Sequence, residues 1–378
     1  MKIAIDYTPA ALQGAGIGRY TRGLVDALLP LLGEDDQLTL LYPRGDAPFA
    51  RASWPERVRV RRLPLPDRWQ TILWHRLRAP LPVDWWTGDA DIFHAPNFLL
   101  PPVRRAKTLL TIHDLAFMVR PQYAFPDLRR FLEKAAPRSI ARADHILADS
   151  EASRQDAIRL FGLEPQRVTV VGAGVEPRFR PLPPEETAAV RGKYGLDGPF
   201  VLSVSTIEPR KNFDGLVRAF AQARREARFP HHLVIAGGKG WLYEPVFRAV
   251  EEENAGDIVH FLGFVPDEDL PALYNLAELF AFPSHYEGFG LPVLEALACG
   301  TAVICTDVSS LPEIAGDAAL LIPADDHDAL VVGLLRLLTD ADARDELAAR
   351  GPARAAHFTW DAAARRLWDA YRAVIGLR

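Results

Sequence analysis

The stretch SHYEGFGLPVLEALACG, residues 284–300, carries the strongest structural and chemical signal in the chain. Its proline suits the first turn of a helix and its final glycine suits a C-terminal cap, so we expect a helix over about residues 291–299. The two glycines ahead of that helix let a ligand approach the backbone N–H groups, and the helix N-terminus adds positive potential there. The stretch therefore predicts a ligand-binding loop and helix that follow a strand.

Two glutamates of this stretch lie eight positions apart. Glu287 is in the loop, and Glu295 is about one turn inside the expected helix. Two carboxylates at that separation can accept hydrogen bonds from different parts of one polyhydroxylated ligand. Considered alone, the same pattern is also that of a turn, a capped helix and two surface acids.

Short apolar runs alternate with amphipathic stretches of helical period along almost the whole chain. Strands that alternate with helices predict βαβ units and parallel sheets buried on both faces. The runs are too many for one open sheet of ordinary size, so we expect two Rossmann-like domains. The expected strands are Ile3–Ile5, Leu38–Leu41, Val58–Val60, Ile92–Phe93, Thr108–Ile112, His145–Ala148, Val168–Val171, Val201–Val204, Leu233–Ile235, Ile258–Phe261, Leu279–Phe282, Ala302–Ile304 and Ala319–Ile322.

A break between domains is expected at residues 172–184, where two glycines and four prolines fall within thirteen residues. Such a composition does not form a regular element and suits a connection. We therefore expect one domain over residues 1–174 and a second over 182–357. The C-terminal helical segment, 358–378, is expected to pack back on the first domain.

The motif of Glu287, seven residues and Glu295, set within Tyr-Glu-Gly-Phe-Gly-Leu-Pro, resembles the signature of the family 4 glycosyltransferases. The resemblance covers essentially the whole chain. It implies an α/β fold of the GT-B type, in which two Rossmann-like, doubly wound domains face each other across a cleft. It also implies a retaining reaction, with Glu287 near the donor sugar and Glu295 on the nucleotide ribose. Gly288, Phe289 and Gly290 would complete this part of the donor site.

A second charged segment, STIEPRKNF at residues 205–213, follows the expected strand at 201–204. Arg210 and Lys211 are expected at the start of the next helix, where a phosphate oxygen is favoured. Transfer from a nucleotide-diphosphate sugar builds negative charge on the leaving group, and two cations can stabilise that charge without a metal. The segment resembles the family's diphosphate-binding loop, which adds Ser205 to the expected donor contacts. An isolated Arg–Lys pair is usually a solvated helix end.

The loop QGAGIGRY, residues 13–20, follows the first strand. Its Gly-x-Gly-x-Gly spacing does not match the Gly-x-Gly-x-x-Gly of a dinucleotide site, and the loop is too long for the tight first turn of an NAD site. What remains is a flexible loop at a helix N-terminus. The resemblance implies that Gly16 and Gly18 lie close to the donor phosphates; a plain turn is the alternative.

Three further positions follow expected strands at their carboxyl ends, where ligands bind in α/β sheets. His113 could hydrogen-bond a sugar hydroxyl, and the resemblance places it beside the donor sugar. Gly237 and Val265 lie in loops that resemble those around the nucleotide base and donor sugar, and Val265 could offer backbone contacts to a base. A structural histidine and ordinary glycine turns are the alternatives.

Composition narrows the class of protein. No apolar run reaches the ~18 residues that a membrane span needs, and Asp6 stands where a signal peptide would still be apolar. Two cysteines allow no disulfide framework. We therefore expect a cytoplasmic protein with no cofactor and no metal. Asp89 and Asp91 match the metal-binding Asp-x-Asp of the other main glycosyltransferase fold, but they would open a strand at its amino end.

Charge is divided unevenly along the chain. Residues 1–180 carry 26 Lys and Arg against 20 Asp and Glu, whereas the rest carries 18 against 29. Within the basic half, residues 57–86 combine cations with tryptophans, which suits an anionic membrane face or a carbohydrate acceptor. Peripheral contact with the inner face of the membrane is therefore a hypothesis, with solvated arginines as the alternative. The acidic overall charge argues against nucleic acid as a partner.

These patterns together predict retaining, metal-independent transfer of a hexose from a nucleotide-diphosphate sugar to a glycan or lipid-linked glycan. The opening segment and Ile-His-Asp-Leu at 112–115 resemble mannosyl-type members that elongate surface polysaccharides, so GDP-mannose is the first candidate donor. UDP-sugar-dependent glucosyl or N-acetylglucosaminyl transfer is the alternative within the class. The sequence also leaves open a GT-B phosphorylase, a nucleotide-sugar epimerase and a non-catalytic nucleotide-sugar-binding protein.

Overall fold

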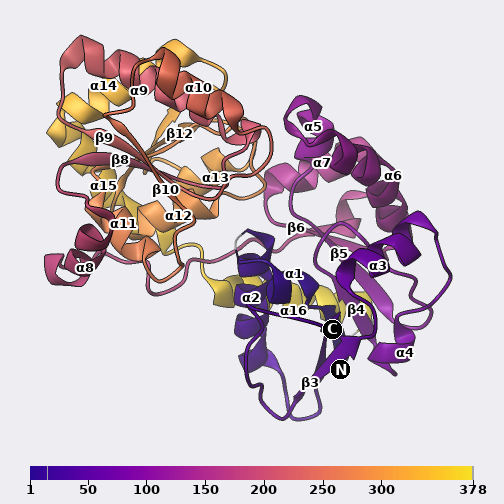
Figure 1. The fold of residues 1–378 in the computed structure, drawn as a ribbon. Coiled ribbons are helices and arrows are strands. Elements are labelled where there is room, and N and C mark those ends of the chain that lie inside the picture. The colour runs from indigo at the N-terminus through magenta and orange to yellow at the C-terminus, as the bar shows by residue number, and fades with distance from the viewer. Residues whose placement is uncertain (15, 377–378) are drawn as a thin grey trace. The chain divides into compact units, whose positions relative to one another are not determined.

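The computed structural model describes residues 1–14 and 16–376 (Figure 1). The chain forms two compact units. Unit 1 comprises Met1–Met118, Asp127–Gly174 and the chain from Thr359 onward, and unit 2 comprises Val119–Pro126 and Val175–Phe358. Each strand expected from the sequence is present. One residue of the glycine loop and the last two of the expected C-terminal helix lie outside the described residues.

Unit 1 is built on a seven-stranded parallel sheet of order β3-β2-β1-β4-β5-β6-β7. The central strands are apolar and buried, whereas β3 lies at an edge and exposes arginines between its buried ends. The order reverses between β1 and β4, and ligands of such sheets bind at the carboxyl ends of the strands beside this switch point. The strands are β1 (Lys2–Asp6), β2 (Gln37–Pro43), β3 (Val58–Leu63), β4 (Ile92–Ala95), β5 (Lys107–Ile112), β6 (His145–Ala148) and β7 (Val168–Val170).

The C-terminal helix belongs to unit 1, where it packs on the first long helix of the chain (Figure 1). The Trp360 and Tyr20 rings lie 5.8 Å apart, and the Tyr371 hydroxyl is 2.7 Å from His94 Nδ1. Gly23 permits this approach, because a Cβ there would lie 2.5 Å from the Trp360 ring. The helices are α1 (Thr8–Leu12), α2 (Ile17–Leu28), η1 (Leu29–Leu31), α3 (Asp67–Thr71), η2 (Ile72–Arg76), α4 (Asp84–Thr87), α5 (Ala116–Val119), α6 (Pro126–Arg142), α7 (Glu151–Phe161), η4 (Pro165–Arg167) and α16 (Trp360–Val374).

Unit 2 is built on a six-stranded parallel sheet of order β10-β9-β8-β11-β12-β13, with its switch point between β8 and β11. Its strands are again short apolar runs with both faces covered, as parallel sheets require. They are β8 (Phe200–Val204), β9 (His232–Ala236), β10 (Val259–Gly263), β11 (Leu279–Phe282), β12 (Ala302–Thr306) and β13 (Leu320–Ile322).

Helices cover both faces of the second sheet. On one face α9 packs against α10 and α14, around a core that includes Leu216, Phe220 and Leu334; on the other, α12 packs against α11 and α15 (Figure 1). The helices are η3 (Pro121–Tyr123), α8 (Pro184–Tyr194), η5 (Pro209–Lys211), α9 (Phe213–Ala227), α10 (Glu244–Glu252), α11 (Leu270–Leu276), α12 (Leu291–Ala298), α13 (Leu311–Ala315), α14 (His327–Thr339) and α15 (Ala341–Ala355).

The segment Val119–Pro126 lies within the range 1–174 expected for the first domain, but it packs with unit 2. The Tyr123 ring stacks on His285 with centroids 4.4 Å apart, and Trp241 Nε1 donates to the Tyr123 carbonyl at 3.1 Å. Arg120 pairs with Asp325 at 3.7 Å. These partners are more than a hundred residues away in sequence, so no local pattern could have revealed the assignment.

Candidate active site

The two charged loops predicted from the sequence begin on neighbouring strands at the switch point of unit 2. Strand β11 pairs with β8, with Leu279 opposite Val201. The loops that follow them are joined by a backbone hydrogen bond, in which His285 N–H donates to the Arg210 carbonyl at 2.8 Å. The parallel pairing therefore brings residues about 75 positions apart in the chain to one edge of the sheet.

Glu287 is bound by both predicted cations. Lys211 Nζ lies 2.6 Å from Glu287 Oε1, and Arg210 Nη1 lies 3.1 Å from Oε2. We expected the cations at the start of the next helix, but they lie in the 3₁₀ turn η5, because Asn212 adopts a positive φ of 55° before α9 begins. This turn directs both side chains toward Glu287, and Lys211 and Glu287 are only 9% and 6% exposed.

Burial and charge act against each other in this cluster. Burial alone would raise the pKa of Glu287, but the charges of Lys211 and Arg210 outweigh it, and the pKa is lowered. Burial, followed by the charge of Arg210, lowers the pKa of Lys211 despite the attraction of Glu287. Glu287 is therefore held ionised against two cations whose N–H donors are already oriented, which is the arrangement that stabilises developing negative charge.

Glu208 is a member of the cluster that the sequence analysis missed. Its Oε1 lies 2.7 Å from Arg210 Nη2, and the residue is buried. Arg210 is thus held between two carboxylates, Glu208 and Glu287. An acid two positions before an arginine carries no recognisable signal, so only the folded contact identifies it.

The Glu287 loop is held by a serine pair after β12. Glu287 N–H donates to Ser309 Oγ at 2.8 Å, and Ser310 Oγ lies 3.1 Å and 2.8 Å from the carbonyl oxygens of Glu287 and Phe289. Gly288 and Phe289 are buried in this loop. Gly290 ends it with a φ of 105°, a conformation that favours glycine, and α12 begins at the next residue.

Glu295 lies on α12, as expected, and is 2% exposed. The Tyr274 hydroxyl of α11 donates to Glu295 Oε2 at 3.0 Å. The two glutamates of the motif therefore have different surroundings: Glu287 is bound by cations and Glu295 by a phenol. Tyr274 is a second residue of the site that the sequence did not indicate.

The remaining donor residues predicted for unit 2 follow β8, β9 and β10. Gly237 N–H donates to the Gly263 carbonyl at 2.7 Å. A Cβ on Gly237 would lie 1.8 Å from the Ser205 carbonyl oxygen, so the three loops meet only because this residue is glycine. Val265 is buried in the loop after β10. Ser205, Gly237 and Val265 therefore line up along neighbouring strand ends.

His113 lies in unit 1, at the end of β5, and is 6% exposed. Its Nδ1 is 2.7 Å from Asp149 Oδ2 and its Nε2 is 2.6 Å from the Pro96 carbonyl oxygen. Burial would lower the pKa of His113, but the charge and hydrogen bond of Asp149, together with the Pro96 carbonyl and the charge of Asp114, outweigh it, and the pKa is raised. Both ring nitrogens already have partners, so a hydrogen bond to a sugar would require one of these contacts to open.

The local backbone of the first loop requires glycine at positions 16 and 18. Gly16 is the N-cap of α2 at φ 53° and ψ −117°, and a Cβ on Gly18 would lie 2.0 Å from the Gln13 carbonyl oxygen. Arg22 holds the loop by donating to the carbonyls of Gln13 and Gly14 at 2.7 Å and 3.0 Å. The predicted helix N-terminus is present, and the turn itself needs both glycines.

Asp6 ends β1, at the switch point of unit 1, and was missed as a candidate. Its Oδ1 accepts a hydrogen bond from Thr8 N–H at 3.0 Å. Burial raises the pKa of Asp6 to about 6. Asp6 therefore places a partly buried carboxyl at the carboxyl end of β1, beside the switch point of unit 1.

The Asp-x-Asp pair lies at the amino end of β4. Lys2 N–H donates to Asp91 Oδ2 at 2.7 Å, and the Lys2 side chain pairs with Asp89. Within residues 1–14 and 16–376, no group of three or more His, Cys, Asp or Glu side chains is placed to hold a metal ion. None of the helices in the same ranges has the length and apolar character to cross a membrane.

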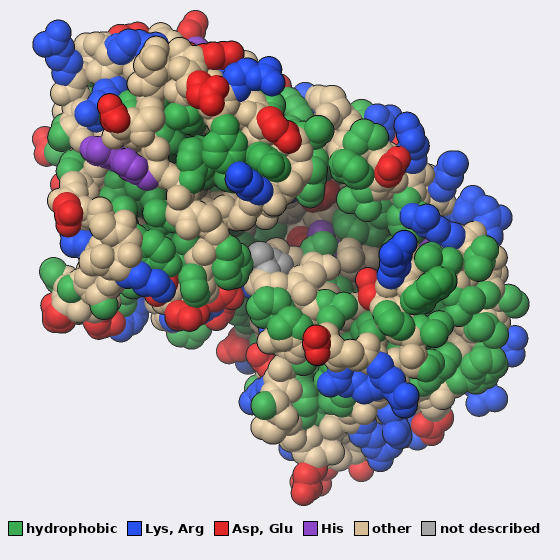
Figure 2. All heavy atoms as spheres, in the orientation of Figure 1, with side chains coloured by type: hydrophobic (Ala, Val, Ile, Leu, Met, Phe, Trp, Pro, Cys, Tyr) green, Lys and Arg blue, Asp and Glu red, His purple; other side chains and the backbone are tan. Residues whose placement is uncertain are grey.

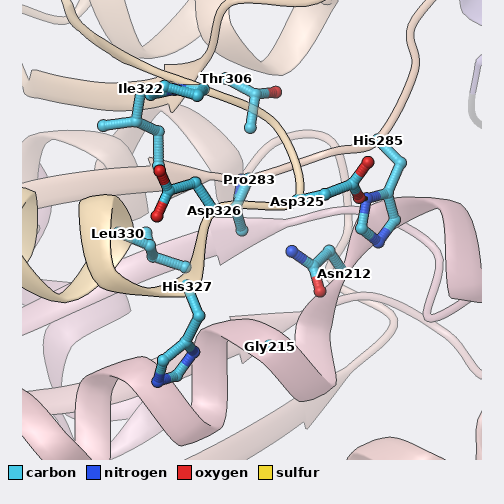
Figure 3. A pocket seen from close by; sticks show the side chains of 11 residues that line it. Asn212, Gly215, Pro283, His285, Thr306, Ile322, Asp325, Asp326, His327 and Leu330 are labelled. Atoms are coloured by element: carbon cyan, nitrogen blue, oxygen red, sulfur yellow. Dashed lines mark ion pairs between the residues drawn. The ribbon is translucent and has the colours of Figure 1, made fainter.

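Unit 2 also contains a cavity of about 200 Å³ at the ends of β11, β12 and β13 (Figure 3). His285 and Asp325 face each other at its edge, 2.6 Å apart. None of the predicted donor residues lines it. The lining residues are Asn212, Gly215, Pro283, His285, Thr306, Ile322, Pro323, Asp325, Asp326, His327 and Leu330.

Two family models match the chain: Glycosyl transferases group 1 over residues 187–354, and Glycosyltransferase Family 4 over residues 14–179. The chain is 35% identical over 386 residues to O-antigen chain mannosyltransferase B of Escherichia coli, covering 98% of this chain and 100% of that protein. It is 35% identical over 263 residues to the serotype-specific mannosyltransferase WbdA of Escherichia coli, covering 67% of this chain and 32% of that protein. Sucrose-phosphate synthase from Thermosynechococcus elongatus has a similar structure, with a TM-score of 0.77 and 25% identity over 100% of this chain and 99% of that one.

Two parallel α/β units of Rossmann type, with sucrose-phosphate synthase as a structural neighbour, define the GT-B fold, and the family models define the class as a glycosyltransferase. The chain belongs to glycosyltransferase family 4. The family, the fold class and the enzyme class predicted from the Glu287–Glu295 motif are thereby confirmed.

Proposed function

We propose that this enzyme transfers mannose from GDP-mannose to a glycan or lipid-linked glycan, with retention of the anomeric configuration and without a metal. The observation that carries the proposal is the buried cluster of Lys211, Arg210 and Glu287 at the switch point of unit 2. Two mannosyltransferases at 35% identity support mannose as the sugar.

Different residues of unit 2 bind different parts of the donor. Arg210 and Lys211 bind the diphosphate, because fixed cations in a buried site favour an incoming anion. Glu287 lies over the sugar, and Glu295 accepts hydrogen bonds from the ribose hydroxyls. Gly237 lets three strand-end loops approach closely, so the backbone around Ser205, Val265 and Gly288–Gly290 can follow the nucleotide and sugar.

The chemistry requires one bond to break and one to form on the same face of the sugar. The bond from the anomeric carbon to the diphosphate oxygen breaks while the acceptor oxygen bonds to that carbon. The acceptor proton passes to the departing diphosphate oxygen, and Arg210 and Lys211 stabilise the charge that remains. His113 of unit 1 acts on the donor sugar, and the loop of Gly16 and Gly18 borders the donor phosphates.

A nucleotide panel tests the donor first. GDP should raise the melting temperature more than UDP or ADP, because a ligand at 100 times its Kd adds ~2.7 kcal/mol of stability. Labelled GDP-mannose should then mannosylate a panel of lipid-tailed mannosides at a rate unaffected by chelator, giving an α-linked product by NMR. Stabilisation by UDP alone would move the enzyme to the UDP-sugar alternative. Tight nucleotide binding without any transfer or hydrolysis would favour a non-catalytic binding protein.

A patch on unit 1 supports membrane contact at the inner face. Large apolar side chains are exposed on and around α3, η2 and α4: Trp69 is 58%, Leu77 71% and Trp85 63% exposed. Figure 2 shows hydrophobic side chains over this part of the molecule with Lys and Arg beside them. Basic and aromatic side chains together suit an anionic interface.

Vesicle co-sedimentation tests the membrane contact. Each Lys or Arg near an anionic surface contributes about 1 kcal/mol, so association should be reversible and should weaken with salt. Trp69→Ala with Trp85→Ala should reduce binding to anionic vesicles, while Trp241→Ala of unit 2 serves as a control. No sedimentation of the wild type with anionic vesicles at low salt would leave a soluble acceptor, and the transferase proposal would stand.

A further inference from the structure

The ring of His113 joins the ends of three neighbouring strands of unit 1. His113 follows β5, Asp149 follows β6, and Pro96 follows β4. The Pro96 carbonyl can only accept a hydrogen bond, so the nitrogen 2.6 Å from it, Nε2, carries the proton. That leaves Nδ1 to share a proton with Asp149 Oδ2 at 2.7 Å. The backbone carbonyl of His113 is also engaged, by Ser153 Oγ at 3.0 Å.

The turn that this ring contacts has a strained backbone. Phe98 has a φ of 51°, which is unfavourable for a bulky side chain. Its N–H donates to the Thr111 carbonyl at 3.1 Å, and its ring packs edge-on against His113 and Phe117. A conformation of this kind persists only where its surroundings hold it, and such positions cluster at ligand sites. The turn follows β4, at the switch point of unit 1.

Two of the titratable side chains that enclose the pair, His94 and Tyr20, are neutral. Burial, followed by the charge of His113, lowers the pKa of His94 to about 3, so His94 is neutral. Burial, with the nearby Asp149, raises the pKa of Tyr20 well above its usual range, so Tyr20 is neutral as well. The titratable and charged groups around the pair are Tyr20 from α2, His94 from β4, Asp114 after β5, and Arg366 from α16, whose charge acts on Tyr20.

We infer that Asp149 is a positioning residue for His113, and that the pair holds the turn at Pro96–Phe98 in the shape that a sugar ligand meets at the switch point of unit 1. The inference rests on the proposed function in one respect, namely that the ligand at this switch point is a sugar.

Two substitutions at Asp149 distinguish its effect on the shape of the turn from its effect on the protonation of His113. In Asp149→Asn the amide N–H can donate to Nδ1 while Nε2–H stays on the Pro96 carbonyl, so the turn should be kept and the shared proton lost. Asp149→Leu removes both the hydrogen bond to Nδ1 and the shared proton. The matched control is Asp144→Leu, since Asp144 joins the same two strands at their amino ends through Thr108.

Two measurements on the full chain test the inference. In Asp149→Leu, hydrogen exchange of the 96–100 segment should accelerate about 10-fold or more, whereas Asp149→Asn and Asp144→Leu should exchange as the wild type does. In Asp149→Asn, His113 should titrate at lower pH than in the wild type, as followed by NMR of labelled histidine. Unchanged exchange in Asp149→Leu, or an unchanged His113 titration in Asp149→Asn, would overturn the inference.

The inference can still be tested if one variant does not fold or if the wild type shows no transferase activity. If Asp149→Leu does not fold, the His113 titration in Asp149→Asn against Asp144→Asn still decides whether Asp149 acts on His113. Neither measurement needs a donor or an acceptor. Absence of mannosyl transfer by the wild type would therefore overturn the proposed function and leave the two readouts standing.

Discussion

Unit 1 and unit 2 each place a buried acid–base cluster at the carboxyl edge of a parallel sheet. The pKa of the buried acid is shifted in opposite directions in the two clusters. In unit 2, Lys211 and Arg210 surround Glu287, whose pKa is lowered. In unit 1, one imidazole, His113, faces one carboxylate, Asp149. Burial raises the pKa of Asp149, and the charge and hydrogen bond of Asp149, with Pro96 and Asp114, outweigh the effect of burial on His113, whose pKa is also raised.

The difference follows from the number and kind of cations. Lys211 and Arg210 together keep Glu287 ionised and gather several N–H donors in one buried cluster, in which Arg210 also pairs with Glu208. One imidazole beside one carboxylate shares a single proton, which makes a directional link between strands with little charge to spare. The first arrangement suits the binding of a diphosphate, and the second suits the positioning of a loop.

The largest effect should come from removing a cation of unit 2. Lys211→Ala should lower kcat by ~100-fold or more, because the lost donor acts on charge that develops in the transition state. Steady-state kinetics with GDP-mannose measures this. Lys193→Ala, at an exposed lysine paired with Asp269, is the control and should behave as the wild type. Equal rates in the Lys211 variant and the wild type would refute the phosphate assignment.

Substitution of each glutamate of the motif should affect a different kinetic property. Glu287→Gln should lower kcat about 10–100-fold with a smaller change in donor affinity, because it alters the cluster that acts on the reacting sugar. Glu295→Gln should mainly weaken nucleotide binding, since ribose contacts exist in ground and transition states alike. Calorimetry with free GDP separates the two. GDP binding to Glu295→Gln as tight as to the wild type would make the ribose assignment wrong.

The glycine at the end of β9 offers a matched pair of variants. Gly237→Ala should destabilise the protein by about 1–3 kcal/mol and weaken GDP binding, because its Cβ would meet the Ser205 carbonyl oxygen at 1.8 Å. Gly238→Ala is the control, since nothing lies within 4 Å of a Cβ there. Chemical denaturation measures both variants. Equal stability of the two would show that the three loops can separate without cost.

The smallest effects should appear in the pH dependence of stability, and their signs should be opposite in the two units. The raised pKa of His113 means that its stabilisation is complete below its unfolded pKa of about 6.5 and is lost as pH rises through the folded pKa. The lowered pKa of Glu287 means that its stabilisation is present above its unfolded pKa of about 4.3 and is lost as pH falls through the folded pKa.

Differences between wild type and variant isolate these contributions from other titrations. The stability advantage of the wild type over His113→Gln should shrink as pH rises from about 6.5, and its advantage over Glu287→Gln should shrink as pH falls below about 4.3. A pKa that differs by one between the unfolded and folded states changes the free energy of unfolding by up to about 1.4 kcal/mol. Denaturant unfolding across this pH range measures both. Parallel pH profiles for the two variants would contradict the comparison between the units.

Much of this molecule follows from its sequence alone. Apolar runs of strand length between amphipathic stretches determined the two parallel sheets, because burial on both faces requires such runs. The proline and final glycine of residues 284–300 determined where α12 begins and ends. Glu287 and Glu295 identified the family, since their spacing and neighbours form a local signature. Each of these signals is short-range and can be read from adjacent residues.

Only the tertiary structure decided which residues surround these signals and with what charge. Glu208, Asp149 and Tyr274 have no motif of their own, and each gains its role from a partner on another loop or helix. Likewise Val119–Pro126 joins unit 2 through side chains that are remote in sequence. The direction of each pKa shift is set by burial and by neighbouring charges, and both arise only when distant strand ends meet at one edge of a sheet.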